Sequence, residues 1–156
     1  MARKLPIGIQ SFEKIRTGGF TYIDKTDLIY QLASTNSPYF LSRPRRFGKS
    51  LLMSTLEAYF LGKKELFTGL AMETLETEWK EYPVLHLDLN ARNYDSKEAL
   101  VAILNQHLEK WEAKYGDEKK ERSPEERFSY LLERIHEASG SQVVILIDEY
   151  DKPLLQ

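Results

Sequence analysis

The chain has 156 residues, of which 42% are hydrophobic and 29% charged, and its formal net charge is −2. This length and balance are typical of one soluble globular domain with a sizeable core. The near-neutral charge gives no argument for binding to nucleic acid or to a membrane, and no apolar run approaches the length of a membrane span. There is no cysteine, which excludes disulfides and thiolate metal sites and is compatible with the cytoplasmic location that we expect.

The spacing of apolar residues predicts alternating helices and strands along the chain. Residues 5–16 suit a loop with one or two helical turns, and residues 20–24 suit a short strand or extended segment. The later elements are predicted in this order: a helix from Asp27 to about Ser34, a short strand at Tyr39, a helix from the following loop to Gly62, a strand at 83–89, a helix from Ser96 to Tyr115, a helix from Ser123 to Gly140, and a strand from Val143. This order predicts an α/β fold of the P-loop NTPase type, with a parallel sheet flanked by helices.

The triplet Gly48-Lys49-Ser50 matches the second half of the phosphate-binding loop G-x-x-x-x-G-K-[ST]. Gly48 lets the backbone pass close to a phosphate, and Lys49 would contact the β- and γ-phosphate oxygens. Ser50 offers its hydroxyl to the Mg²⁺ that bridges these phosphates. The N–H groups of the loop and first helical turn would face the anion, so the predicted nucleotide contacts are Arg45, Arg46, Phe47, Gly48, Lys49, Ser50 and Leu51.

One position departs from this pattern, because Arg43 stands where the first glycine is expected. Taken alone, a G-K-S triplet is also compatible with chance. Its context favours the phosphate loop, since a strand is predicted before it and a helix after it. The arginines Arg43, Arg45 and Arg46 could contact phosphates, nucleic acid or an acidic surface, and charge complementarity around a nucleotide is the favoured interpretation.

A second motif ends the predicted strand at Val143, where five consecutive aliphatic residues are followed by Asp148 and Glu149. Such a run predicts a strand buried on both faces, as in the centre of a parallel sheet. Carboxylates at the carboxyl end of such a strand lie where open α/β sheets bind ligands. Asp148 would hold Mg²⁺ through water, and Glu149 would orient the attacking water. The alternative is a core strand followed by an exposed acidic turn.

The sequence does not decide the roles of several other polar and aromatic residues. Asp88 ends the second predicted strand and either lines the same cleft or is a surface acid. The three histidines, His86, His107 and His136, share no metal-ligand spacing. Three aromatic residues could frame an adenine ring or belong to the core: Phe12, Tyr22 and Tyr39.

Four segments together resemble the prokaryotic AAA-ATPase-like family: residues 5–8 (LPIG), 22–26 (YIDKT), 42–50 (SRPRRFGKS) and 147–153 (IDEYDKP). The resemblance covers nearly the whole chain, and the family's loop commonly carries arginine where Arg43 stands. It implies an ATPase of the additional-strand class with strand order 5-1-4-3-2, often followed by a PD-(D/E)XK nuclease-like domain. By this resemblance Lys49 and Ser50 bind phosphate and Mg²⁺, Asp148 binds Mg²⁺, and Glu149 is the catalytic carboxylate.

We interpret residues 1–156 as the N-terminal part of an AAA-ATPase-like domain from a longer bacterial protein, truncated before its last strands. The expected function is ATP binding with Mg²⁺ and hydrolysis of ATP to ADP, slow in this segment itself. The alternative is a nucleotide-gated interaction module that binds ATP with little turnover. Unpaired central strands would favour self-association, and nucleic acid is expected only as a partner of a missing C-terminal domain. No membrane partner is expected.

Overall fold

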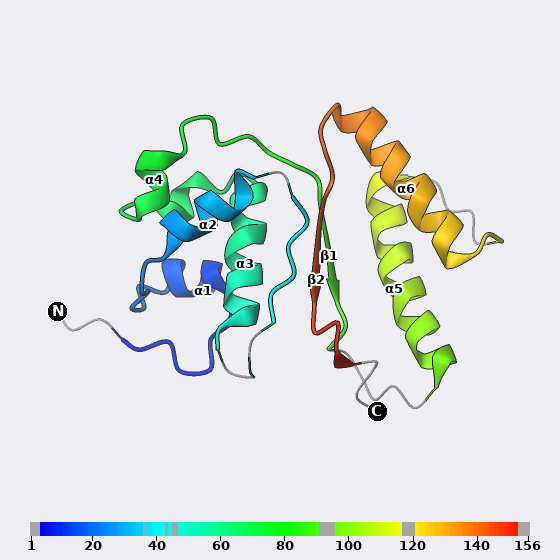
Figure 1. Cartoon of the computed structure of the whole chain (residues 1–156), viewed down its shortest axis with the longest axis horizontal. Coiled ribbons are helices and arrows are strands. Elements are labelled where there is room, and N and C mark those ends of the chain that lie inside the picture. Colours follow the sequence, from blue (N-terminus) through cyan, green and yellow to red (C-terminus); the bar gives the residue numbers. More distant parts are fainter. Residues whose placement is uncertain are drawn as a thin grey trace. The chain divides into compact units, whose positions relative to one another are not determined.

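The structure, a computed structural model, describes residues 4–35, 37–42, 44, 47–90, 96–116 and 121–152. The chain divides into two compact units, one ending at Glu81 and one beginning at Tyr82, and each is described by itself. The first unit contains α1 (Phe12–Thr17), α2 (Thr26–Ala33), α3 (Lys49–Phe60), the 3-10 helix η1 (Lys64–Phe67) and α4 (Ala71–Leu75). The second contains β1 (Val84–Asp88), α5 (Lys97–Tyr115), α6 (Pro124–Ser139) and β2 (Val144–Asp148) (Figure 1).

The core of the first unit is centred on Phe12, which has no exposed surface. Its ring lies 5.1 Å from that of Tyr22 and 4.9 Å from that of Phe67, measured between ring centroids. Ile15 is buried one helical turn further along α1, so the weak apolar pattern of this region marks one buried helix face. Helix α1 packs in this way against α3 and η1.

A network of hydrogen bonds joins the starts of α2 and α4. Asp24 Oδ1 accepts from the backbone N–H and the hydroxyl of Thr26, at 2.9 and 2.7 Å, and Asp24 Oδ2 accepts from the N–H of Ala71 at 2.7 Å. The hydroxyl of Thr26 in turn accepts from the N–H of Met72 at 3.0 Å. Partial desolvation raises the pKa of Asp24, but these hydrogen bonds outweigh it and lower that pKa below its ordinary value.

The second unit has a parallel pair of strands with two helices on one side (Figure 1). The register pairs Val84 with Val144 and continues to Asp88 with Asp148. The core between strands and helices contains these buried residues: Leu85, Leu108, Trp111, Leu131 and Ile135. The α/β class with a parallel sheet is thus confirmed, because the long connection between two parallel strands is helical.

Both helices of this unit begin at the serines that the sequence predicts. Ser96 accepts a hydrogen bond from the N–H of Ala99, and Ser123 forms a complete capping box with Glu126. Helix α6 ends at Gly140, whose φ of 62° lies in the left-handed region that glycine adopts without cost. These boundaries were predictable because each depends on a few neighbouring residues.

Two sequence-based expectations are wrong. The segment at Tyr39 is not a strand, and its apolar side chains are largely exposed, with Phe40 at 72%. A strand requires a neighbouring backbone, and the sheet in the described part of the chain consists of β1 and β2 without this segment. The second error concerns β2, which is not buried on both faces: Ile145 and Ile147 are 40% and 47% exposed.

No helix in the described part of the chain has both the length and the apolar character that crossing a membrane requires.

Candidate nucleotide site

The phosphate-loop triplet lies where a helix begins. Gly48 has φ 76° and ψ 19°, in the left-handed region, and α3 starts at the next residue, Lys49. A Cβ atom at Gly48 would meet no heavy atom within 4 Å, so the backbone conformation and not crowding is the reason for glycine here. The local geometry agrees with the sequence-based prediction of a tight turn that opens a helix.

The start of α3 differs from the starts of α1, α5 and α6. The side chains of Ser11, Ser96 and Ser123 accept hydrogen bonds at the starts of α1, α5 and α6. At α3, by contrast, no described side chain caps the first turn. The N–H groups of a first helical turn have no partner within the helix and attract anions. An uncapped turn of this kind is suited to a phosphate group.

The structure describes five of the seven predicted nucleotide contacts, in consecutive positions. Lys49, Ser50 and Leu51 form the first turn of α3 directly after Gly48, and all three are half-buried. Phe47 precedes them and is 62% exposed. Arg45 and Arg46, like Arg43, lie outside the described residues.

The predicted acidic pair lies at the end of β2. Asp148 is the last residue of the strand, and its Oδ1 accepts from the N–H of Glu149 at 2.9 Å. Glu149 has φ 55°, a left-handed conformation that is uncommon for residues other than glycine and clusters at functional sites. The N–H of Lys152 donates to the carbonyl of Glu149 at 3.0 Å and closes the turn. The strand therefore ends abruptly, with Glu149 just beyond its last residue.

Asp88 belongs to the same end of the sheet. It is the register partner of Asp148 and is exposed, and its Oδ1 accepts from the N–H of Asn90 at 2.8 Å. The N–H of Leu89 donates to the carbonyl of Asp148 at 3.1 Å, and the ammonium of Lys152 contacts Oδ1 of Asn90. The segments that follow the two strands are thus tied together, and Asp88 lies beside the predicted metal ligand.

Each half of the predicted site lies within one unit: Lys49 and Ser50 in the first, Asp148 and Glu149 in the second. Among the described residues, no group of three or more histidines and carboxylates is arranged to hold a metal ion by itself. Magnesium in nucleotide sites takes only one or two protein ligands and completes its shell with phosphate oxygens and water. A hydroxyl, as on Ser50, and a carboxylate, as on Asp148, are each among the ligand types that magnesium takes.

The aromatic residues considered as an adenine frame have different environments. Phe12 is fully buried in the core. Burial raises the pKa of Tyr22, whose side chain is hydrogen-bonded to Thr55. Tyr39 is 55% exposed, and its hydroxyl is hydrogen-bonded to the hydroxyl of Thr35. Phe12 is therefore a core residue, and of these three aromatics Tyr39 is the most accessible.

Two of the histidines bind backbone carbonyls. Nε2 of His107 lies 3.2 Å from the carbonyl oxygen of Asp88, and Nδ1 of His136 lies 2.8 Å from that of Ser141. Both contacts stabilise element ends in the second unit.

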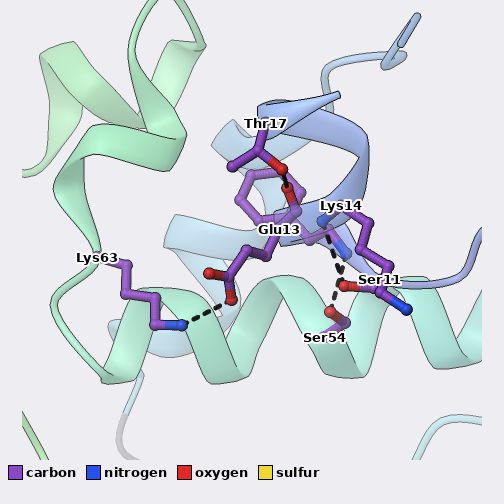
Figure 2. A network of polar contacts seen from close by, with 7 residues as sticks. Ser11, Glu13, Lys14, Thr17, Ser54 and Lys63 are labelled. Atoms are coloured by element: carbon purple, nitrogen blue, oxygen red, sulfur yellow. Dashed lines mark hydrogen bonds and ion pairs between the residues drawn. The ribbon is translucent and has the colours of Figure 1, made fainter. Parts of the chain in front are cut away.

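Sequence reasoning missed the contacts that fasten the N-terminal region to α3. The N–H of Phe12 donates to Oγ of Ser54 at 2.9 Å, and Glu13 pairs with Lys63 at 2.7 Å (Figure 2). The available signal was Ser11 before Phe12, a serine in a position to cap a short helix. The sequence holds no comparable signal for the partner residue on α3.

The fold and these two motifs define an α/β protein with a phosphate-loop sequence at a helix start and an acidic pair at a strand end. A family model described as "Predicted AAA-ATPase" matches residues 6–156, and the chain belongs to this AAA-ATPase-like family. It is 41% identical over 160 residues to a protein of Azotobacter chroococcum mcd 1 described as an uncharacterized protein in the vnfD 5′ region. That match covers 98% of this chain, and the chain spans 30% of the relative's length. No solved structure matches the chain.

Proposed function

We propose that this chain is the ATP-binding module of an ATPase, and that it binds ATP with Mg²⁺ at the loop leading into α3. The observation that carries the proposal is the left-handed Gly48 before an uncapped helix that begins with Lys49 and Ser50. Membership of a family described as a predicted ATPase supports nucleotide binding independently of this geometry.

The residues receive the following roles. The Lys49 ammonium binds the β- and γ-phosphate oxygens, and the N–H groups of the first turn bind the same anion. The Ser50 hydroxyl and the Asp148 carboxylate hold Mg²⁺, which when bound neutralises phosphate charge. Oδ1 of Asp148 accepts from the N–H of Glu149, a hydrogen bond that orients the carboxylate. Glu149 orients the attacking water and accepts its proton.

The test is a titration of the chain with a fluorescent ATP analogue in the presence of Mg²⁺. Lys49→Ala removes a charge-assisted contact of about 1.5–3 kcal/mol, so we expect roughly a tenfold to hundredfold loss of affinity. Lys64→Ala is the matched control, because it removes the same charge from an exposed position beyond the far end of α3. Equal affinity of wild type and Lys49→Ala would reject the phosphate-loop assignment.

A nucleotide-gated module that binds ATP with little turnover is the rival proposal. The strained backbone of Glu149 favours hydrolysis, because a carboxylate held at φ 55° at the end of a strand suits the positioning of water. Measurement of turnover, and not of binding, separates these two functions.

A further inference from the structure

The segment from residue 11 to residue 22, termed here the lead-in, is fastened to the helix that begins at the phosphate loop. Phe12 is the first residue of α1, so its N–H has no acceptor within its own helix. Oγ of Ser54, on α3, accepts from this N–H at 2.9 Å. Figure 2 shows Ser54 on its helix next to the start of the lead-in.

Ser54 lies one helical turn beyond Ser50, on the same side of α3. The next residue, Thr55, has no exposed surface, is hydrogen-bonded to Tyr22 and donates to the carbonyl of Leu51 at 2.8 Å. The lead-in therefore holds two adjacent residues of α3, at Ser54 and Thr55. These residues follow directly on the first turn, where Lys49 and Ser50 lie.

Further polar contacts of the lead-in lie beyond the C-terminal end of α3. Glu13 pairs with Lys63 at 2.7 Å (Figure 2), and the Nε–H of Arg16 donates to the carbonyl of Leu66 at 2.7 Å. A second N–H of Arg16 donates to the carbonyl of Thr68. The lead-in is thus fastened to the middle of α3, at Ser54, and to the segment that follows the helix, and the Ser54 contact is the one nearer to the phosphate loop.

We propose that Ser54 is a positioning residue, which sets nucleotide affinity by fixing the first turn of α3 against the lead-in. The inference rests on the proposed function, because it concerns the same loop. Serine is a poorer helix former than alanine, so a serine in the middle of α3 calls for a specific contact. The affinity for an anion that is bound by N–H groups and Lys49 depends on the direction in which these groups point. A helix that is free to shift holds them less well in the direction that binding requires.

The experiment compares Ser54→Ala with wild type for the affinity of the fluorescent ATP analogue with Mg²⁺ and for the thermal unfolding midpoint. Titrations are run well below both midpoints, so that every chain is folded. Loss of the acceptor should lower affinity about threefold to tenfold, the range of one hydrogen bond. Ser54→Thr keeps the hydroxyl and should bind within about twofold of wild type.

Arg16→Met is the matched control, because it loosens the same lead-in at its far anchor. It should lower the unfolding midpoint without changing affinity. If Ser54→Ala fails to fold, Ser54→Cys replaces it, because sulfur is a weaker acceptor of nearly the same size, and a smaller loss of affinity is expected.

Three results bear on the inference in different ways. Wild-type affinity in Ser54→Ala, or in Ser54→Cys where that variant is used, would overturn it. An equal loss of affinity in Arg16→Met and Ser54→Ala would also overturn it. The affinity for the ATP analogue would then depend on how firmly the whole lead-in is held, and not on the Ser54 contact. A wild-type chain that binds no nucleotide would instead overturn the proposed function itself.

Discussion

At the scale of single residues, the most deeply buried charges in the described part of the chain form one pair in the second unit. Arg127 and Glu112 join α6 to α5, and their side chains are 5% and 3% exposed. The guanidinium binds both carboxylate oxygens, at 2.9 and 2.6 Å, and also donates to Asn105 at 2.7 Å. Bidentate geometry of this kind satisfies both groups at once, and so little of either side chain is exposed that water cannot readily replace a lost partner.

Removal of one partner should therefore be costly. Glu112→Ala removes the carboxylate that binds two nitrogen atoms of the buried Arg127 guanidinium, so we expect the free energy of unfolding to fall by about 3–5 kcal/mol. The apolar double variant Glu112→Leu with Arg127→Met should recover most of this loss, because no charge is then buried. Urea unfolding monitored by circular dichroism measures both. A single variant as stable as wild type would show that the pair does not hold α5 to α6.

At the scale of elements, the sequence predicts what depends on neighbouring residues. The capping serines, Gly140 and the triplet at Gly48 were placed correctly because each signal lies within a few residues of the boundary it sets. The strand expected at Tyr39 was wrong, since an apolar run cannot indicate whether a partner strand is present. The hydrogen bond between Phe12 and Ser54 was missed because its partners are far apart in the sequence.

The exposed side of β2 leads to a prediction about assembly. Ile145 and Ile147 are exposed on a strand whose only described neighbour is β1. Open strand edges with apolar side chains tend to pair with other chains. We expect the chain to self-associate as its concentration rises, which light scattering would detect.

Ile147→Lys should reduce this association, because a charge on an edge strand opposes pairing. Leu28→Lys is the matched control, since it makes the same kind of change at an exposed position on helix α2. A monomer at all concentrations would contradict the prediction, and so would an equal effect of the two substitutions.

At the scale of the whole molecule, the phosphate-binding half and the acidic half of the proposed site belong to different compact units. In the proposed function, binding needs chiefly the first half, whereas hydrolysis also needs the second. Cationic groups that stabilise the transferred phosphoryl, such as arginine fingers, contribute about 10³–10⁵ in rate to P-loop enzymes. Because the chain spans 30% of its relative's length, we propose that a longer protein supplies such groups.

The last prediction separates binding from catalysis at Glu149. We expect the 156-residue chain to bind nucleotide and hydrolyse it slowly, and a longer protein containing it to hydrolyse ATP faster. In that longer protein Glu149→Gln should abolish turnover and leave affinity unchanged, because the amide keeps the size of the side chain but cannot accept the proton of water. Phosphate release measures turnover, and titration with the ATP analogue measures affinity. Glu137→Gln, at an exposed position of α6, is the control and should match wild type in both. If Glu149→Gln hydrolyses ATP as fast as wild type, Glu149 is not the catalytic carboxylate, and the nucleotide-gated module becomes the better description of this protein.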